Sequence, residues 1–321
     1  MKPVTRDRGG VSGCRDRLPQ LGDELFLTDS GLETDLLFNG GFDLPDFASF
    51  VLLDNDTGLA ALDAYFRSHV DLALDSGVGI VIETPTWRAS SDWAARLGYD
   101  TSRLADVIRQ AVDLLIAVRA DRDVSAPPVV ISGCLGPRGD GYSPGFRMSA
   151  HEAQDYHRPQ VETFAATDID LVSAMTITYA DEAIGIARAA TAAGLPSVIS
   201  FTVETDGRLP DGSSVTSAIS VVDDATGGGP SYYALNCAHP THLGASLLDA
   251  GATGRLRGIR ANASRMSHLE LDNSQELDAG DPIEFGQLMN EIHQSVPDVT
   301  ILGGCCGTDI RHIREIVASC L

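Results

Sequence analysis

The stretch LAALDAYFRSHVDLALDSGVGIVIET, residues 59–84, carries the pattern that decides the fold. Its first part has the spacing of a helix with one apolar face, formed by Leu59, Leu62, Phe66, Val70 and Leu74. Its last part, VGIVIET at residues 78–84, is an apolar run of strand length. Strands that are apolar throughout are typical of parallel sheets, whose two faces are both covered.

The same alternation continues along the chain, with eight apolar runs that are mostly separated by helical periodicity. The runs lie at residues 25–29, 78–84, 127–133, 169–176, 196–204, 231–237, 255–262 and 299–304. Between them, Ser149-Ala-His-Glu152 is a capping box that opens a helix, and Pro159 is expected to kink that helix.

Eight strand–helix repeats in one chain predict an α/β fold, a (β/α)8 barrel of TIM type in a single domain. An open doubly wound sheet is the alternative. Such a sheet would need a glycine-rich phosphate turn after its first strand, and LTDSGLETD at residues 27–35 has no G-x-G-x-x-G. The barrel is therefore preferred.

Composition excludes several classes of function. The 321 residues carry a net charge of −22, and so acidic a surface repels nucleic acids and anionic membranes. The only lysine is Lys2, so no lysine in the folded part can form a Schiff base with a substrate or pyridoxal phosphate. No P-loop motif and no run of eighteen apolar residues are present, which excludes P-loop chemistry and a membrane span.

The chain is expected to have two parts. Residues 1–20 are basic, contain glycine and proline, and lack the apolar stretch of a signal peptide, so we expect a disordered N-terminal tail there. Residues 21–321 are expected to form the barrel. With six cysteines and no secretion signal, the thiols are expected to be reduced and the protein cytoplasmic.

Three cysteines are predicted to meet at one end of the barrel, because reactive groups lie where parallel strands end. Cys237 follows the sixth run, and Cys305 and Cys306 follow the eighth, in ILGGCCGTDI at residues 301–310. Small buried thiols or a vicinal disulfide are the alternatives. We predict instead that the three cysteines bind a catalytic Zn²⁺, because three thiolates leave the fourth tetrahedral position open.

Three thiolates also indicate the reaction. They give the zinc site a net negative charge, which makes it a weak electrophile but suits a soft fourth ligand such as a substrate thiol. Zinc lowers the pKa of that thiol and leaves its sulfur nucleophilic. The predicted reaction is attack of a thiol on an activated methyl group.

Polar residues at the other strand ends are candidates for substrate binding: Asp29, Glu83, Thr84, Trp87, Asn236 and Gly304. Asp29 and Glu83 could hold an ammonium group or bond to loop amides. Trp87 could face a cationic methyl donor or pack in the core. The Gly303 and Gly304 amides, with a helix capped by Thr308, could hold a carboxylate.

Other metal ligands and cysteines have simpler interpretations. His239 and His242 lie close to Cys237 and could bind a metal, but then Cys305 and Cys306 would have no role. Supporting or loop roles are expected for both histidines. Core packing is expected for Cys134, whereas Cys14 and Cys320 are expected to be incidental.

GGCCGT at 303–308, together with Asn236-Cys237 and D-x-G-L-x-T at 29–34, resembles the homocysteine S-methyltransferase family. Supporting stretches are ETPTWRAS (83–90), GCLGPRGD (133–140), HRPQVETFA (157–165) and SFTVETDGRLPDG (200–212). The resemblance implies a homocysteine-binding (β/α)8 barrel over residues 21–321. It also implies Zn²⁺ held by Cys237, Cys305 and Cys306, which act in catalysis through the metal. Homocysteine would be the acceptor and methionine the product, with Asp29 near the substrate.

One position departs from the family pattern. Met175 stands where the family usually carries a glutamate that contacts the amino acid. Either another acid, with Glu83 the best candidate, takes over that contact, or the acceptor is a different thiol.

The expected partners are small molecules, a thiol acceptor and a methyl donor, with neither nucleic acid nor membrane. From the sequence, we expect neither the long C-terminal extension of the betaine-dependent enzymes nor a cobalamin or folate module. The expected donor is therefore a sulfonium, S-methylmethionine or S-adenosylmethionine. A non-catalytic protein that binds zinc or a thiol is the alternative from another class.

Overall fold

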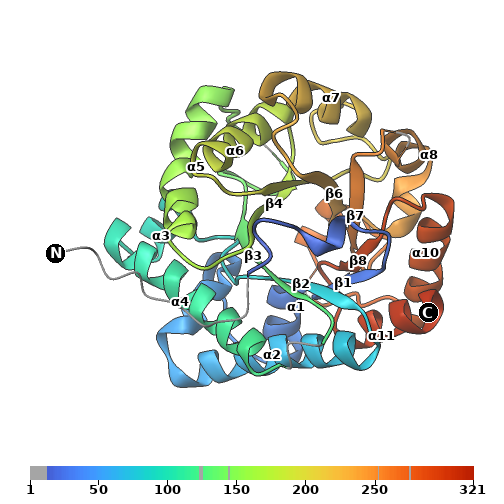
Figure 1. Cartoon of the computed structure of the whole chain (residues 1–321), viewed down its shortest axis with the longest axis horizontal. Helices are drawn as coiled ribbons and strands as arrows, with labels where there is room; N and C mark the ends of the chain where they lie inside the picture. The colour runs from blue at the N-terminus through green and yellow to red at the C-terminus, as the bar shows by residue number, and fades with distance from the viewer. Residues whose placement is uncertain (1–12, 123–125, 144, 252, 275) are drawn as a thin grey trace.

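Eight parallel strands form a closed barrel in the computed structural model, which describes residues 13–122, 126–143, 145–251, 253–274 and 276–321 (Figure 1). Strand order follows chain order, and the last strand pairs with the first. The strands are β1 Phe26–Thr28, β2 Gly79–Glu83, β3 Val129–Leu135, β4 Leu171–Ile177, β5 Ser197–Phe201, β6 Tyr232–Asn236, β7 Leu256–Ala261 and β8 Ile301–Gly304. Each coincides with one predicted run, and the predicted (β/α)8 fold is confirmed.

Helices surround the barrel (Figure 1). They are α1 Leu32–Thr34, α2 Asp56–Asp75, α3 Ser91–Arg96, α4 Thr101–Ala120, α5 Ala150–Ala165, α6 Ala180–Ala192, α7 Val215–Thr226, α8 Pro240–Gly251, α9 His268–Asp272, α10 Pro282–Ser295 and α11 Ile310–Cys320. Shorter helical turns cover Pro19–Leu21, Asp35–Asn39, Pro45–Phe47 and Ser49–Asp54. The capping box of Ser149 and Glu152 opens α5 as predicted, and α5 continues through Pro159.

Two apolar layers hold the barrel together. The outer layer lies between strands and helices, and it includes Leu27, Ile82, Leu115 and Phe164. The inner layer consists mainly of inward-facing strand residues: Phe26, Val81, Val130, Leu171, Val198, Tyr232, Ala234 and Ile301. Because side chains alternate along a strand, neighbouring residues such as Phe26 and Leu27 fall into different layers.

The segment before β1 packs against the barrel. Leu18 joins the inner layer, and the Arg15 guanidinium donates to the carbonyl oxygen of Ile169 at 2.7 and 3.0 Å. The Cys14 amide donates to Asp170 at 2.6 Å. The structure therefore places residues 13–20 on the barrel, where the sequence predicted a disordered tail, because Leu18 extends the apolar interior. Residues 1–12 of that predicted tail lie outside the described residues.

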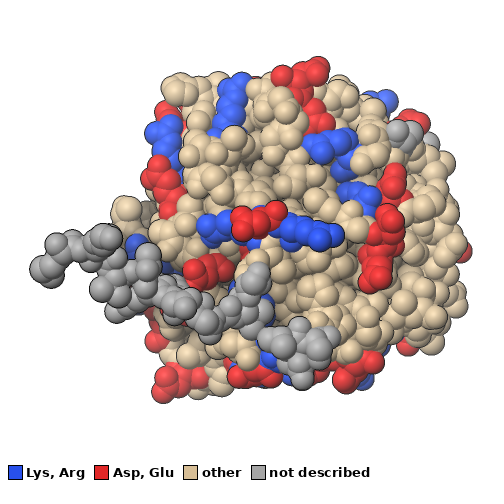
Figure 2. Space-filling model, viewed as in Figure 1, with Lys and Arg blue, Asp and Glu red and all other residues tan. Residues whose placement is uncertain are grey.

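Charged groups are spread over the surface. Figure 2 shows acidic side chains around the rim of one face with basic side chains among them, rather than one large patch of either sign. Within the described residues, no helix combines the length and apolar character needed to cross a bilayer.

Candidate active site

The three predicted cysteines meet at the carboxyl ends of β6 and β8. The Sγ atoms of Cys237, Cys305 and Cys306 all lie within 4.8 Å of one another, and the three thiols are free. Cys237 is buried, and the other two are partly buried. His239, His242 and Cys134 are outside this cluster among the described residues. The ring nitrogen Nδ1 of His239 instead contacts the Thr241 hydroxyl at 2.8 Å.

The glycines before the cysteine pair allow close packing. A Cβ atom on Gly303 would lie 1.9 Å from the Thr28 hydroxyl oxygen, and one on Gly304 would lie 2.0 Å from the Thr308 hydroxyl oxygen. Either distance is far below van der Waals contact. Both positions therefore need glycine so that the end of β8 can lie against β1 and its own following turn.

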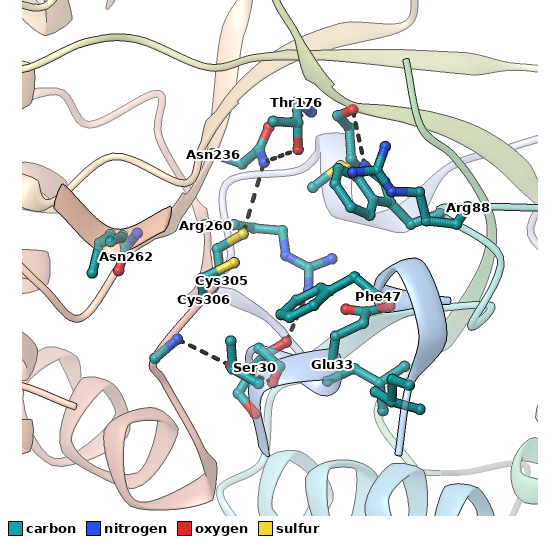
Figure 3. Close-up of a pocket in the computed structure, with 18 of the residues that line it drawn as sticks. Ser30, Glu33, Phe47, Arg88, Thr176, Asn236, Arg260, Asn262, Cys305 and Cys306 are labelled. Carbon is teal, nitrogen blue, oxygen red and sulfur yellow. Dashed lines mark hydrogen bonds between the residues drawn. The ribbon is translucent and has the colours of Figure 1, made fainter. Parts of the chain in front are cut away.

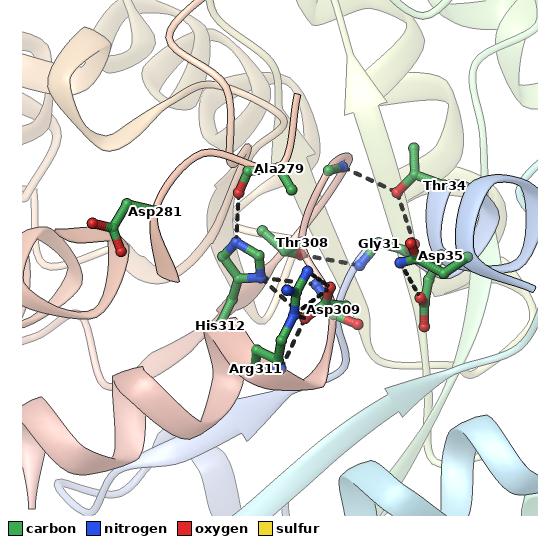
Figure 4. Close-up of polar contacts among 12 residues, drawn as sticks. Gly31, Thr34, Asp35, Ala279, Asp281, Thr308, Asp309, Arg311 and His312 are labelled. Atoms are coloured by element: carbon green, nitrogen blue, oxygen red, sulfur yellow. Dashed lines mark hydrogen bonds and ion pairs between the residues drawn. The ribbon is translucent and has the colours of Figure 1, made fainter. Parts of the chain in front are cut away.

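Thr308 joins the two turns that hold the pair (Figure 4). Its hydroxyl donates to the Cys305 carbonyl oxygen at 2.7 Å and accepts from the Gly31 amide at 3.1 Å. The predicted cap of α11 was wrong by one residue, because Asp309 is the capping residue and forms a capping box with His312. Thr308 is instead the residue that ties Cys305 to the turn after β1.

The predicted carboxylate-binding role of Gly304 does not match its contacts. The Gly304 amide donates to the Asp29 carbonyl oxygen at 3.2 Å, and the Cys305 amide donates to that of Ala261 at 2.8 Å. These amides are thus engaged in joining β8 to β1 and β7, and they position the cysteines.

Cys237 adopts a left-handed backbone conformation, with φ of 59°. For a residue other than glycine this conformation costs roughly 1–3 kcal/mol and persists only where the surroundings impose it. Here the Cys237 amide donates to the Arg260 carbonyl oxygen at 3.0 Å, and the Cys237 carbonyl oxygen contacts Nε2 of His268 at 2.7 Å. These contacts hold the Cys237 thiol toward the cysteine pair.

Polar groups lie beside the three sulfur atoms, and Figure 3 shows the hydrogen bond between Asn236 and Cys305. The Tyr142 hydroxyl lies 2.9 Å from the Cys237 sulfur. The side-chain amide of Asn236 donates to Cys305 and that of Asn262 donates to Cys237, both at 3.8 Å. Donors of this kind stabilise negative charge on sulfur.

The thiols also act on one another. Hydrogen bonds from Cys237 and Cys306 hold the pKa of Cys305 well below its ordinary value. Hydrogen bonds with Cys237 and, next, with Cys305 raise the pKa of Cys306. Three thiolates this close would repel one another, so a cation is needed for all three to lose their protons. This donor set fits Zn²⁺, which prefers thiolate ligands.

Two further residues that were predicted to contact the substrate, Asn236 and Thr84, form hydrogen bonds within the protein. The Asn236 side-chain oxygen accepts from the Thr176 amide and the Ser200 hydroxyl, both at 2.8 Å. The Thr84 hydroxyl accepts from the Cys134 amide at 3.0 Å. Asn236 and Thr84 lie at the pocket, but their hydrogen bonds position neighbouring strand ends.

Asp29 and Glu83 are joined by an arginine, Arg260, that the sequence pattern did not predict at the site. The Arg260 guanidinium lies 2.6 Å from Asp29 and 3.1 Å from Glu83. Burial raises the pKa of Asp29 to about 7, although Arg260 opposes this effect. With both carboxylates paired to Arg260, neither is a free partner for a substrate ammonium group. The available signal was a charged residue inside an apolar strand.

The site opens into a cavity of about 630 Å³. Its walls include Met175, Trp87, Arg88 and Glu33, together with Cys305 and Cys306 of the cluster. Glu33 was also missed, and it takes part in none of the ion pairs among the described residues. The Ser49 hydroxyl donates to Glu33 at 2.7 Å, and burial raises the pKa of its carboxyl despite that hydrogen bond.

Comparisons with known proteins identify the family of the chain and agree with its fold. The family model described as homocysteine S-methyltransferase matches residues 27–320. Among solved structures, the oxidised form of the homocysteine methyltransferase MmuM from Escherichia coli is similar, with a TM-score of 0.75 and 20% identity, covering 96% of this chain and 99% of that one. Its metallated form gives a TM-score of 0.72 and 20% identity, covering 93% and 96%. No curated protein sequence matches the chain significantly.

Proposed function

The chain belongs to the homocysteine S-methyltransferase family, and from this premise we propose that it is a zinc-dependent thiol S-methyltransferase. In the proposed reaction, homocysteine accepts a methyl group from a small sulfonium, S-methylmethionine or S-adenosylmethionine, and becomes methionine. The observation that carries the proposal is the group of three cysteine sulfurs within 4.8 Å of one another, of which Cys305 and Cys306 line the cavity.

Cys237, Cys305 and Cys306 would hold the zinc through their thiolates, with the acceptor sulfur in the remaining position. A zinc ion held by these residues would supply the positive charge that lowers the pKa of the acceptor thiol. The Asn236 and Asn262 amides, at 3.8 Å from Cys305 and Cys237, would steady the negative charge of the ligands.

The transfer itself is a displacement at the methyl carbon. The acceptor sulfur attacks that carbon, a new carbon–sulfur bond forms, and the bond to the positively charged donor sulfur breaks. Its electron pair stays on the donor sulfur, which leaves as a neutral thioether, and the acceptor's thiol proton goes to solvent. The chain contributes mainly by holding both sulfur atoms and the methyl carbon in line.

Purified protein is expected to contain about one zinc and to form methionine from homocysteine and S-methylmethionine. The measurement is a metal assay coupled to a grid of donors and acceptors. Zinc binding without transfer from any donor would reject the enzyme proposal and leave a zinc- or thiol-binding protein. A protein without zinc would reject the proposal at its base.

Met175 favours a second candidate, the same chemistry on another thiol. Its side chain lines the cavity, and Asp29 and Glu83 are both paired to Arg260. Glu33, in α1, also lines the cavity. Its carboxylate accepts a hydrogen bond from Ser49 but has no cationic partner among the described residues. In the grid, weak use of homocysteine beside strong use of another thiol would select this candidate.

Glu33 is the carboxylate that we expect to meet an acceptor's ammonium group. Glu33→Gln is therefore expected to raise the acceptor KM about tenfold with little change in kcat, because one charged contact is lost. Steady-state kinetics with each substrate varied in turn measure this effect. Asp35→Asn is the control, since Asp35 is nearby but bonds to Asn39 outside the cavity wall. A rise in donor KM alone would contradict the assignment.

A further inference from the structure

Arg88 is a buried cation that stands apart from the ion pairs of the described residues. It is 8% exposed, it lines the cavity, and no carboxylate of the described residues forms an ion pair with it. Arg260, at the same cavity, instead contacts two carboxylates. A buried charge is costly unless it is paired, so the Arg88 guanidinium calls for an anionic partner from outside the chain.

The guanidinium is held in a defined orientation. Its central carbon lies 4.0 Å from the Trp87 ring centroid and 4.0 Å from the Trp93 ring centroid, so its plane is bounded by two indoles. Its Nη1 donates to the Gly139 carbonyl oxygen at 3.1 Å. Stacking sets the plane and the hydrogen bond sets the rotation, as in an arginine preorganised to bind an anion.

Donors remain on this guanidinium. Nε is buried without a hydrogen-bond partner, and Nη2 makes no hydrogen bond within the described residues. Figure 3 shows Arg88 at the cavity, on the opposite side from Cys305 and Cys306. A substrate whose sulfur lies at the cysteines can thus extend toward Arg88 with its other end.

Three acids act electrostatically on Arg88 without forming an ion pair with it among the described residues: Asp140, Glu33 and Asp46. Asp46 forms an ion pair with Arg96 at 2.8 Å. Asp140 accepts from the backbone amides of Tyr142 and Ser143 at 2.8 Å each. Glu33 accepts from Ser49. A direct ion pair with Arg88 is therefore left for a ligand anion to form.

We propose that Arg88 binds the carboxylate of a substrate and thereby sets which substrates the cavity accepts. This inference rests on the proposed function, which supplies two amino acid substrates, and the carboxylate can come from the thiol acceptor or from the sulfonium donor. It also replaces the Gly304 amide, which is engaged with Asp29, as the group that recognises a carboxylate.

The proposal is tested by measuring, with titration calorimetry, how tightly two pairs of ligands bind to the zinc-loaded protein. The acceptor pair is homocysteine and 3-aminopropane-1-thiol, and the donor pair is S-methylmethionine and (3-aminopropyl)dimethylsulfonium. The members of each pair differ only in the carboxylate. Wild-type protein is expected to bind the carboxylate member of one pair about 10- to 100-fold more tightly. That pair identifies the source of the carboxylate.

Arg88→Gln is expected to abolish this preference while binding of the decarboxylated member stays unchanged. Arg103→Gln is the matched control, since Arg103 stacks on the Tyr99 ring at 4.7 Å but is 56% exposed, and neither it nor its ion-pair partner Asp54 lines the cavity. It is expected to keep the wild-type preference. If circular dichroism shows that Arg88→Gln is unfolded, Arg88→Lys decides, with a reduced preference expected because the planar fork is lost.

Equal binding, or no binding, of both members of both pairs to wild-type protein would overturn the proposal. So would a preference that survives in the folded Arg88 variant. The binding measurement does not require turnover. If methyl transfer were absent, the proposed function would be rejected, but the binding preference would still show whether Arg88 recognises a carboxylate.

Discussion

Replacing Cys306 with alanine is expected to remove nearly all bound zinc and to slow methyl transfer by more than about a thousandfold. The remaining two thiolates, Cys237 and Cys305, cannot complete a three-cysteine site. Without the metal the acceptor thiol stays largely protonated, and loss of several kcal/mol of charge stabilisation corresponds to at least this factor in rate. Metal content after gel filtration and methionine formation at saturating substrates measure the two effects.

Cys134→Ala is the matched control for that experiment. Cys134 is also buried and also lines the cavity, but it lies outside the cluster of three sulfurs. It is expected to keep both zinc and activity. If Cys306→Ala retained its zinc, the three-cysteine site would be wrong. Loss of zinc from a His239→Ala variant in the same series would then point to the histidines as ligands.

The cysteine cluster could be predicted because it depends on topology alone. Parallel strands of a closed barrel all end at one rim, so residues that directly follow two strands must face the same opening. Cys237 follows β6, and Cys305 and Cys306 follow β8. The eight strands could also be predicted from the sequence. Both faces of each strand are covered, so each strand is an apolar run between more polar segments.

Arg260 could not be placed in the same way, because its role depends on register. It pairs with Gly303 of the neighbouring strand, and its guanidinium reaches Asp29 after β1 and Glu83 of β2. Sequence places an arginine in the seventh run but does not say which face it occupies or what lies opposite. The consequence was large, since Asp29 and Glu83 were expected to meet the substrate and instead meet Arg260.

Glu33 and Arg88 were missed for a related reason. Both lie just after a strand, in loops and short helices whose course depends on packing against distant segments. Glu33 reaches Ser49, and Arg88 reaches Trp93 and Gly139. Only tertiary structure brings such residues to one cavity, whereas the strand-end rule locates the rim itself.

Arg260→Met is expected to destabilise the protein by about 3–5 kcal/mol. Methionine fills much of the same space but leaves Asp29 and Glu83 buried without a cation, and removal of one partner from a buried ionic group has a cost of this size. Urea-induced unfolding at matched zinc content measures the change. Arg265→Met is the control, because its ion pair with Glu284 is exposed and contributes about 1 kcal/mol or less.

The stability loss should depend on pH. Burial raises the pKa of Asp29 from 3.8 to about 7, so the folded protein holds a proton that the unfolded chain releases between those values. Stability from this group therefore falls as pH rises through that window. Arg260 opposes the rise in the pKa of Asp29, so in Arg260→Met this pKa is higher still and the loss of stability continues to higher pH. The difference in unfolding free energy between wild type and Arg260→Met should therefore grow from pH 6 to pH 8.

Adding Asp29→Asn and Glu83→Gln to Arg260→Met should restore much of the stability and remove the pH dependence. A deficit that is independent of pH and insensitive to these two changes would mean that Arg260 acts through packing rather than through charge.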